Sequence, residues 1–310
     1  MIKTICGIDI GGTTIKIGFF NLEGRLLKKW EIETNKADKG RYILDDIYES
    51  ILNQCDDMSM IVGYGFGVPG PVIDGKVFHA VNLGWVDFDL KSEFSSLVLN
   101  KKIHVDNDAN VAALGEALMG AAEKYSSSVM LTLGTGIGGG VIINNRIIDG
   151  AHGSAGEIGH MLVVHENGIP CNCGKSGCLE TVASATGIKN LYEKYHQETH
   201  QKTMLEDFTY PSAKMIFDAA KKGDQLSIKV VDEVTYYLGY ACHILSLVTN
   251  PEIIVIGGGV SKAGEYLTDK IKEQFLKFKY SPVRNTMIEP AELGNDAGIY
   301  GAMGMVKNRD

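Results

Sequence analysis

The sequence lacks any long apolar run. Its longest hydrophobic stretches are broken by glycine, asparagine or charged residues, and none approaches the roughly 20 residues that a membrane-spanning helix needs. Residues 1–14 enter a strand-like run with neither an apolar signal core nor a cleavage site, so we expect no signal peptide. The sequence therefore predicts a cytoplasmic protein with no membrane partner.

Positive charge is also scarce. The 310 residues carry a net charge of −8, which argues against nucleic acid as a partner because neutralising phosphates needs a basic face. A nucleotide is not excluded, since backbone N–H groups in glycine loops can bind phosphate without net charge. Hydrophobic residues make up 45% and charged residues 22%, as in ordinary globular proteins, and the length allows two domains of about 150 residues.

Cysteine is sparse, but three of the six cysteines, Cys171, Cys173 and Cys178, lie within eight residues. In a reducing compartment this spacing favours a metal site over disulfides. Glycines beside these cysteines allow the sharp turns of a structural zinc site, which makes buried, unligated cysteines the less favoured alternative. Spacing leaves the fourth ligand open among His152, His160 and His165. The other three cysteines stand alone in apolar patterns and are predicted core residues: Cys6, Cys55 and Cys242.

One pattern of strands occurs twice. Apolar and β-branched residues predict strands at 5–10, 13–20 and 25–33, with a glycine corner after the first strand. The same order returns at 129–133, 141–143 and 146–148, where Asn144-Asn145 predicts a two-residue hairpin turn. We therefore expect two related α/β halves, each opening with an antiparallel meander.

Helical periodicity and apolar runs predict the remaining elements. Helices are expected at 42–55, 109–122, 184–196, 212–222, 225–248, 263–278 and 297–307. Further strands are expected at 61–68, 103–106 and 253–256. The polar segment 196–210 is expected to be a flexible insertion.

Three glycine-rich corners follow predicted strands, at 11–14, 134–140 and 257–259. Each corner alone fits a tight turn as well as a phosphate loop, but three at strand ends favour nucleotide binding. Residues 134–139 match the dinucleotide pattern G-x-G-x-x-G, yet a strand follows where that fold requires a helix. Residues 174–176 resemble the end of a P-loop, but Ile169 occupies its first glycine position. Both of these readings are rejected.

Acidic residues suggest acid–base chemistry at one strand end. Asp106 and Asp108 follow a predicted strand and precede a helix, where a carboxylate could accept a proton from a hydroxyl group. The same position suits a helix N-cap, and spacing alone favours the cap. Glu157 and Glu180 flank the cysteine cluster, and each taken alone would be a solvated charge.

Nine segments together resemble the ROK family (repressors, open reading frames and sugar kinases), and within it the bacterial glucokinases. The segments are Asp9-Ile10-Gly11-Gly12-Thr13 with Lys16, Gly67-Val68-Pro69-Gly70, Asn82-Leu83-Gly84-Trp85, Asn107-Asp108-Ala109-Asn110, 134–140, Gly156-Glu157-Ile158-Gly159-His160, 171–180, 257–261 and Leu293-Gly294-Asn295-Asp296-Ala297. The resemblance covers nearly the whole chain, and the His160 plus C-x-C-G-x-x-G-C-x-E combination is its most specific part.

The resemblance implies an α/β fold of the two-domain actin-like ATPase (ribonuclease H-like) type, with a cleft between the domains. Residues 1–118 would form a small N-terminal domain, with the C-terminal helix 297–310 packing back onto it. Residues 119–296 would form a larger domain that carries the zinc site. The family also implies a homodimer.

The resemblance also implies roles for individual residues. Asp108 would be the general base that takes the proton from the sugar 6-hydroxyl, which reverses the preference for a cap. The sugar would contact Asn82, Asn107, Asp108, Glu157, His160 and Glu180. ATP would contact Asp9, Gly11, Gly12, Thr13, Thr14, Thr135, Gly136, Gly138, Gly257, Gly258 and Gly259. Asp9 would position Mg²⁺ through water, and Lys16 would face a phosphate. Structural Zn²⁺ would bind His160, Cys171, Cys173 and Cys178.

The activity implied is ATP-dependent phosphorylation of glucose to glucose 6-phosphate. The first alternative is a kinase for another sugar: N-acetylmannosamine, N-acetylglucosamine, mannose, fructose or allose. A second alternative, a sugar-responsive transcriptional regulator, is disfavoured because the first glycine loop begins at Gly11 and leaves no room for a preceding helix-turn-helix.

Overall fold

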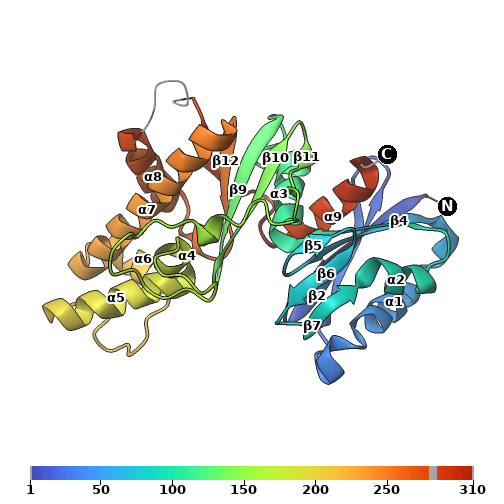
Figure 1. Ribbon diagram of the computed structural model, residues 1–310, viewed down its shortest axis with the longest axis horizontal. Helices are drawn as coiled ribbons and strands as arrows, with labels where there is room; N and C mark the ends of the chain where they lie inside the picture. Colours follow the sequence, from blue (N-terminus) through green and yellow to red (C-terminus); the bar gives the residue numbers. More distant parts are fainter. Residues whose placement is uncertain (1, 279–284, 309–310) are drawn as a thin grey trace. The chain divides into compact units, whose positions relative to one another are not determined.

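The computed structural model describes residues 2–278 and 285–308. The chain divides into two compact units, each considered by itself (Figure 1). The first unit comprises Met1–Ser126, Gly140–Gly156 and Leu293–Asp310, and the second comprises Ser127–Gly139 and Glu157–Glu292. Residues 119–126 and 140–156, which sequence reasoning assigned to the larger domain, cluster with the first unit. Among the described residues, no helix is both long and apolar enough to cross a membrane.

The first unit is built on a five-stranded sheet with the order β3-β2-β1-β4-β8. Its strands are β1 (Thr4–Ile10), β2 (Thr14–Asn21), β3 (Leu26–Glu33), β4 (Ile61–Val68) and β8 (Lys102–Asn107). The pairs β1–β2 and β2–β3 are antiparallel, whereas β1–β4 and β4–β8 are parallel. A smaller sheet contains β5 (Val72–Ile73), β6 (Lys76–Ala80) and β7 (Trp85–Asp89).

Helices cover both faces of this five-stranded sheet. The unit contains α1 (Ile43–Gln54), α2 (Leu90–Leu97), α3 (Asp108–Met119) and α9 (Ala297–Asn308). Alternate residues of β1 divide between the faces, as the two-residue period of a strand requires. Cys6, Ile8 and Ile10 join a core with α1 and α2, whereas Ile5 joins Ile299 and other residues of α9.

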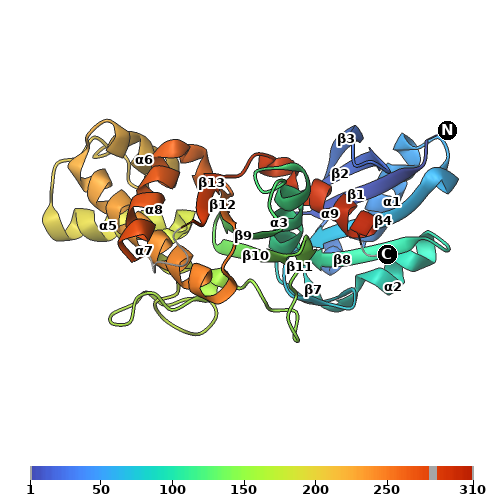
Figure 2. The same cartoon turned by 90° about the horizontal axis from the view of Figure 1, so that it is seen from above.

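Glycines let α9 lie directly against the sheet and against α3 (Figure 2). A Cβ atom added to Gly65 of β4 would lie 1.9 Å from the carbonyl oxygen of Ala302, and one added to Gly301 would lie 1.7 Å from that of Val111. Neither position has room for a side chain, because a backbone carbonyl fills the space. The helix at 297–307 was predicted from the sequence, and the structure extends it to Asn308.

The second sheet repeats the first, with the order β11-β10-β9-β12-β13. Its strands are β9 (Ser127–Leu133), β10 (Ile137–Ile143), β11 (Arg146–Ile147), β12 (Ile253–Gly257) and β13 (Met287–Pro290). The pair β10–β11 is antiparallel, and β12 runs parallel to both β9 and β13. The predicted repetition of one meander is confirmed. The predicted turn is also present, since Asn144 and Asn145 both have positive φ, at 52° and 59°.

Helices make up most of the rest of the second unit. They are α4 (Glu180–Ala183), α5 (Ala185–Thr199), α6 (Ala213–Lys221), α7 (Gln225–Thr249) and α8 (Glu265–Phe278). The long helix α7 packs against α5, α6 and α8. Side-chain caps fix two of the starts, because Ser212 accepts from Met215 N and Asp224 accepts from Ser227 N.

Four predictions need correction. Residues 137–140, expected in a glycine loop, belong to strand β10. The sequence reading missed β5, β6, β7, β13 and α2. The flexible insertion expected at 196–210 is wrong for its central part, where Thr203 and Leu205 are buried. Hydrogen bonds also fix this part, because Tyr192 donates to Thr203 at 3.1 Å and Met204 N donates to Asp224 at 2.7 Å. Of the predicted core cysteines, Cys6 and Cys242 are fully buried, but Cys55 is only half-buried.

Candidate functional site

The first glycine loop joins β1 to β2 through a tight turn. Gly11 N donates to the Thr14 carbonyl at 3.1 Å, and a Cβ on Gly11 would lie 2.8 Å from that oxygen. Thr34, just after β3, holds the loop from the other side: its hydroxyl donates to Gly11 O at 2.7 Å and its N–H to Thr13 O at 3.0 Å. Thr14 therefore serves the turn with its carbonyl, while Thr13 is exposed.

Asn82 lies against this loop. A Cβ atom on Gly12 would be 3.2 Å from the Cβ of Asn82. The segment that carries Asn82 is a turn between β6 and β7, in which Leu83 N donates to Ala80 O at 2.9 Å. The structure thus brings a predicted sugar contact next to a predicted phosphate loop.

Asp9 and Asp108 form the acidic part of the first unit's site. Asp9 lies at the carboxyl end of β1, paired in register with Gly67 of the parallel strand β4 and with Lys16 of β2. Burial and then the negative charge of Asp108 raise the pKa of Asp9 to about 7, while Lys16 acts in the opposite direction. The amine of Lys16 also donates to Asn295 O at 2.6 Å. The carboxyl groups of Asp9 and Asp108 are therefore close enough to repel each other.

The turn from β8 into α3 presents the predicted base. Asn107, not Asp106 or Asp108, is the N-cap, because its side-chain oxygen accepts from Ala109 N at 2.9 Å and from Asn110 N at 3.3 Å. The cap assignment favoured from spacing is wrong for both aspartates. Asn107 also donates to Gly70 O at 3.1 Å. Asp108 opens the first turn of α3 and is half-buried.

The second glycine loop joins β9 to β10. Gly134 N donates to Gly136 O at 3.0 Å, and the start of α5 is fixed on the loop: Ala185 N donates to Gly134 O at 2.8 Å and the Thr186 hydroxyl to Thr135 O at 2.9 Å. A Cβ on Gly136 would lie 2.7 Å from a carboxylate oxygen of Glu180. Gly138 lies outside the turn, within β10.

The third loop follows β12 and contributes to a cavity. Gly258 has φ +83°, and a Cβ there would lie 2.6 Å from the backbone of Leu133, so a glycine is required. A cavity of about 470 Å³ is bordered by Gly134 and Thr135 of the second loop and by Gly259 of the third. The structure therefore brings two of the predicted nucleotide loops to one cavity, whereas Gly257 is the last residue of β12.

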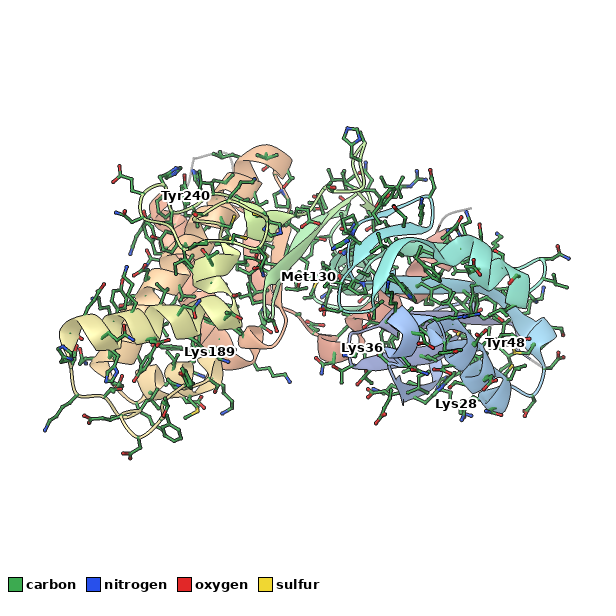
Figure 3. All side chains as sticks on the ribbon, turned by 60° about the horizontal axis from the view of Figure 1, so that its bottom comes forward. Lys28, Lys36, Tyr48, Met130, Lys189 and Tyr240 are labelled. Atoms are coloured by element: carbon green, nitrogen blue, oxygen red, sulfur yellow. The ribbon has the colours of Figure 1, made fainter. Side chains whose placement is uncertain are left out.

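Sequence reasoning missed several residues that line this cavity. They come from α5, α6 and the 3₁₀ turn Val260–Ala263: Lys189, Ser212, Lys214, Phe217, Asp218 and Lys262. Lys189, on α5, is labelled in Figure 3. No motif marks these positions, because each is an ordinary helix or turn residue until the fold gathers them around the glycine loops.

The four predicted metal ligands form one cluster in the second unit. Ligand atoms of His160, Cys171, Cys173 and Cys178 all lie within 4.8 Å of one another. Cys171 Sγ is 3.5 Å from His160 Nδ1, and the sulfur atoms of Cys173 and Cys178 are 3.5 Å apart. Of the three histidines that spacing left open, only His160 joins this group of described residues.

These distances fit a tetrahedral zinc ion. Zinc bonds of about 2.3 Å to sulfur and 2.0 Å to nitrogen place neighbouring ligand atoms roughly 3.5–3.8 Å apart. Burial raises the pKa of Cys171 and Cys178, whereas the backbone N–H of Lys175 lowers the pKa of Cys173. Metal binding at this cluster would therefore release protons from the two buried thiols.

Two glutamates flank the imidazole of His160. Glu180 Oε1 is 3.6 Å from Nδ1 and accepts a hydrogen bond from Cys171 Sγ at 3.0 Å. Glu157 Oε2 is 3.8 Å from Nε2. Glu180 also begins α4 and lies beside Gly136. The cluster, the second glycine loop and both glutamates thus form one connected arrangement within the second unit.

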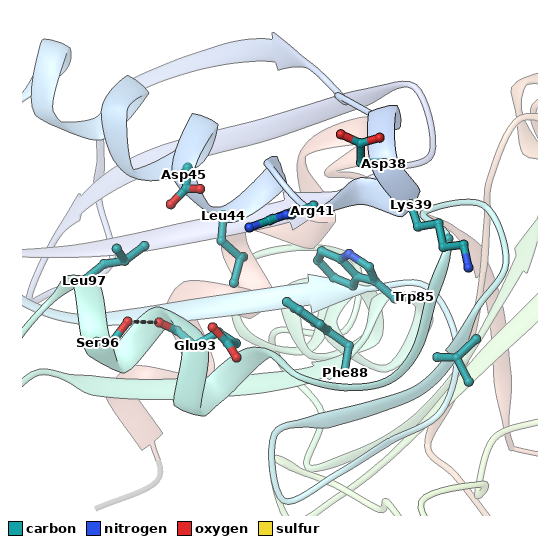
Figure 4. Close-up of a pocket in the computed structure, with 12 residues that line it drawn as sticks. Asp38, Lys39, Arg41, Leu44, Asp45, Trp85, Phe88, Glu93, Ser96 and Leu97 are labelled. Atoms are coloured by element: carbon teal, nitrogen blue, oxygen red, sulfur yellow. Dashed lines mark hydrogen bonds between the residues drawn. The ribbon is translucent and has the colours of Figure 1, made fainter.

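A separate cavity of about 480 Å³ lies in the first unit, bordered by residues before and in α1, by residues of α2 and by Gly84–Phe88 (Figure 4). Trp85 and Phe88 stack there with ring centroids 4.4 Å apart, and Trp85 Nε1 donates to Gly40 O at 3.1 Å. None of the predicted catalytic, sugar, ATP or metal residues lines this cavity.

Comparison with known proteins identifies the family of this chain. The family profile described as "ROK family" matches residues 5–309. The chain belongs to the ROK family. A glucokinase from Halalkalibacterium halodurans is 43% identical to this chain, over 98% of this chain and 95% of its own length. A glucokinase from Thermotoga maritima is 36% identical, over 98% of each chain.

Solved structures agree with this assignment. The crystal structure of a ROK family glucokinase from Streptomyces griseus, in complex with glucose and AMPPNP, has a TM-score of 0.79 and 31% sequence identity to this ROK chain. The match covers 97% of this chain and 98% of that chain. The chain has the two-domain actin-like ATPase fold of the ROK sugar kinases, as the resemblance implied.

Proposed function

We propose that this ROK protein is an ATP-dependent glucokinase that transfers the γ-phosphoryl group of ATP to the 6-hydroxyl of glucose. One observation of the structure carries the proposal: the β8–α3 turn presents Asn107 and Asp108 in the same unit as Asp9, the Gly11–Gly12 loop and Asn82. The 43% identity to a glucokinase across nearly the whole chain supports glucose as the acceptor.

ATP would bind at the cavity of the second unit. The relative from Streptomyces griseus was solved with AMPPNP, a non-hydrolysable ATP analogue. In this chain the cavity offers the apolar ring of Phe217 and the amines of Lys189 and Lys262 beside the loop at Gly134 and Thr135. An aromatic ring with glycine backbone and lysines suits an adenine with its anionic phosphates. The first glycine loop, Gly11 to Thr13, would contact the transferred phosphoryl group.

Asp108 would act as the general base. As the sugar 6-oxygen attacks the γ-phosphorus, its proton passes to the Asp108 carboxylate, the bond from phosphorus to the bridging oxygen breaks, and ADP leaves with that electron pair. Asp108 begins α3 and has Asp9 as a close negative neighbour. The role requires a carboxylate whose geometry is fixed, and the capped turn around Asn107 provides that.

The residues present also fit a magnesium ion. Mg²⁺ prefers carboxylate oxygens and water. Burial, and then the negative charge of Asp108, raise the pKa of Asp9, and a divalent cation would offset that negative charge. Asp9 would hold the ion through water. When bound, Mg²⁺ neutralises charge on the ATP phosphates. Asp9 itself would need to be ionised to take this role.

Zinc would be structural. Its proposed ligands are His160 through Nδ1 with Cys171, Cys173 and Cys178, on the distances given above. A closed set of four protein ligands leaves no open position, as structural sites require. Zinc would orient His160 and the adjacent Glu180, and leave His160 Nε2 facing Glu157.

We propose that the sugar hydroxyls contact the side chains of Asn82, Asn107, Glu157, His160 and Glu180. Carboxylates and amides suit this task, since each can hold a hydroxyl in one orientation. This assignment rests on the family pattern.

The product identifies the reaction. The purified protein, [6-¹³C]glucose and MgATP should give a phosphate signal coupled to carbon 6 in the ¹³C and ³¹P NMR spectra, together with one ADP for each phosphosugar. Phosphate on another hydroxyl, or ADP formation with no phosphosugar, would refute the assignment.

We further propose that the enzyme is cytoplasmic and acts as a homodimer. The acidic composition with clustered cysteines supports the location. Leu247 and Val248, 52% and 77% exposed at the end of α7, are apolar side chains that a dimer interface would cover. Light scattering of the eluted protein should give twice the 33.6 kDa chain mass; a single-chain mass at micromolar concentration would exclude the dimer.

A further inference from the structure

Asp106 is a buried carboxylic acid immediately before the proposed sugar-binding turn. Only 4% of it is exposed, at the carboxyl end of β8. Its Oδ1 accepts hydrogen bonds from Asn107 N at 2.7 Å and from Asn110 Nδ2 at 3.1 Å. Asn110 is itself 3% exposed and lies one turn into α3. One oxygen of Asp106 therefore fastens both the cap residue and the first turn of the helix that begins with Asp108.

A second carboxyl group closes the arrangement. The side chain of Asp149, which follows β11, is hydrogen-bonded to that of Asp106. Two carboxylates have no hydrogen to share, so this bond needs one proton between them. Burial, followed by the charge of Asp149, raises the pKa of Asp106 to about 7, in accord with a proton held by the pair.

Asp149 belongs to a segment with its own contacts in the first unit. Ala155 N donates to Asp149 O at 3.1 Å, and a Cβ on Gly153 would lie 2.6 Å from the Val72 carbonyl. The segment is therefore packed against β5. Through Asp106, Asp149 connects this packed segment to the turn that holds Asn107.

We propose that Asp106 and Asp149 share one proton and act as a positioning pair, which holds Asn107 and Asp108 in the orientation needed for phosphoryl transfer. The role in transfer rests on the proposed kinase function. When the shared proton is lost, the buried carboxylate of Asp106 and the half-buried carboxylate of Asp149 face each other as like charges, and the turn that carries Asn107 and Asp108 must shift. Turnover then falls at alkaline pH.

Other charged groups face the pair across a polar cavity of about 390 Å³. They are Asp74 from the β5–β6 turn, Lys91 from α2 and His104 from β8. Asp74 has φ +53° and is exposed. An asparagine tolerates that conformation, so Asp74→Asn removes a charge from the same cavity without disturbing the pair.

Asp149→Asn and Asp106→Asn test the pair directly, because an amide donates a hydrogen bond at every pH. Wild type should lose kcat with rising pH, whereas each asparagine variant should keep kcat within about threefold at neutral pH and lose the alkaline decline. The Asp74→Asn variant should retain the alkaline decline of kcat. Asp149→Leu, which cannot make the bond, should lower kcat about tenfold or more while KM for ATP changes less than threefold.

The proposal is overturned if the asparagine variants keep the wild-type alkaline decline, if Asp74→Asn loses it equally, or if Asp149→Asn is as impaired as Asp149→Leu. Thermal unfolding from pH 5 to 9 needs no substrate. The unfolding temperature of wild type should fall with pH relative to Asp149→Asn, and parallel curves would refute the shared proton. If the unfolding temperature of wild type falls in this way but the protein phosphorylates no sugar, the shared proton is supported and only the proposed kinase function is refuted.

Discussion

At the scale of single residues, the chemistry depends on a few carboxylates that the fold treats differently. Asp9 is half-buried near the end of β1, Asp106 is buried near the end of β8, and the pKa of each is raised to about 7. Asp108, two residues after Asp106, opens a helix and is half-buried. In the proposed mechanism the proton of the sugar hydroxyl passes to Asp108, whereas Asp9 and Asp106 shape its surroundings.

Asp108→Asn should lower kcat by about 10²–10⁴-fold, because the amide keeps the shape of the carboxylate but cannot accept a proton. Glucose binding, measured by isothermal titration calorimetry in the presence of a non-hydrolysable ATP analogue, should change little. Loss of glucose binding in Asp108→Asn, with unchanged turnover per bound sugar, would make Asp108 a contact and not a base.

Residue roles were the hardest features to derive from the sequence. The cysteine spacing predicted a cluster but left three histidines open. The family resemblance selected His160, and the structure places His160, and not His152 or His165, in the cluster of described residues. Spacing also favoured an aspartate as helix cap, whereas the side chain of Asn107 accepts the two N–H groups. Neighbouring residues with the same capping ability cannot be ranked without the backbone angles that the strand–helix turn imposes.

At the scale of elements, we propose that the segment carrying Cys171, Cys173 and Cys178 depends on a bound zinc ion. Between η3 (Ile158–His160) and α4 its regular pairing consists of two isolated bridges, Leu162–Cys178 and Pro170–Ser176. Backbone hydrogen bonds also hold this segment, with Cys171 N donating to Lys175 O at 2.7 Å and Gly174 N donating to Cys171 O at 3.0 Å. A zinc ion would additionally tie the four ligand side chains to one another.

Cys173→Ala should release the bound zinc and raise KM for glucose, because His160 and Glu180 lose their fixed positions. Cys55→Ala, which removes a half-buried cysteine outside the cluster, should keep both the metal and KM. Metal analysis by mass spectrometry and steady-state kinetics on the same preparations would check this. A Cys173→Ala protein with full zinc content and unchanged KM would show that the cluster is not the zinc site.

The packing of α9 is a second element-scale feature with a sharp test. Gly65→Ala places a methyl group against the Ala302 carbonyl, so it should lower the free energy of unfolding by about 1–3 kcal/mol or more. Gly259→Ala is the matched control, since it has φ −64° and no atom within 4 Å of an added Cβ. Denaturant unfolding should separate the two variants; equal stability would mean that α9 can move away at no cost.

Elements with a clear period were predictable, and glycine-rich strands were not. Strand β4 was placed at its observed bounds, 61–68. The glycines at 138–140 looked like a continuing loop, yet they form part of β10. Glycine has a weak preference for strands, so it is pairing with the neighbouring strands that holds these residues in the sheet. The short strands β5 and β13 contain two and four residues, too few for a period to show.

At the scale of the whole molecule, buried acids make the two units respond to pH in opposite ways. Burial raises the pKa of Asp9 and Asp106 in the first unit. Burial alone would also raise the pKa of Asp224 in the second unit, but hydrogen bonds from the backbone N–H groups of Met204 and Ser227 lower it.

A raised folded-state pKa stabilises the protein below about pH 4, and this contribution is lost as pH rises towards 7; a lowered pKa stabilises above about pH 4, and this contribution is lost as pH falls. Hydrogen exchange measured by mass spectrometry should therefore show β1 and β8 less protected at pH 7.5 than at pH 5, after correction for intrinsic exchange. The start of α7 should lose protection below pH 4. A uniform response in both units would contradict these assignments.

The repeated sheet order explains why one glycine corner recurs in both units and why the sequence repeat was visible. The cavity in the second unit was not visible, because Lys189, Phe217 and Lys262 come from three elements far apart in the sequence. Family membership, and not periodicity, supplied the link from these loops to a sugar kinase.

Steady-state kinetics across a panel of sugars is the most direct test of the claim that glucose is the substrate. The panel should include glucose, mannose, fructose, allose, N-acetylglucosamine and N-acetylmannosamine, with saturating MgATP. We predict the highest kcat/KM for glucose, at least about tenfold above either N-acetylhexosamine, since an added acetamido group must fit a pocket shaped for a hydroxyl. A higher kcat/KM for an N-acetylhexosamine than for glucose would contradict the account.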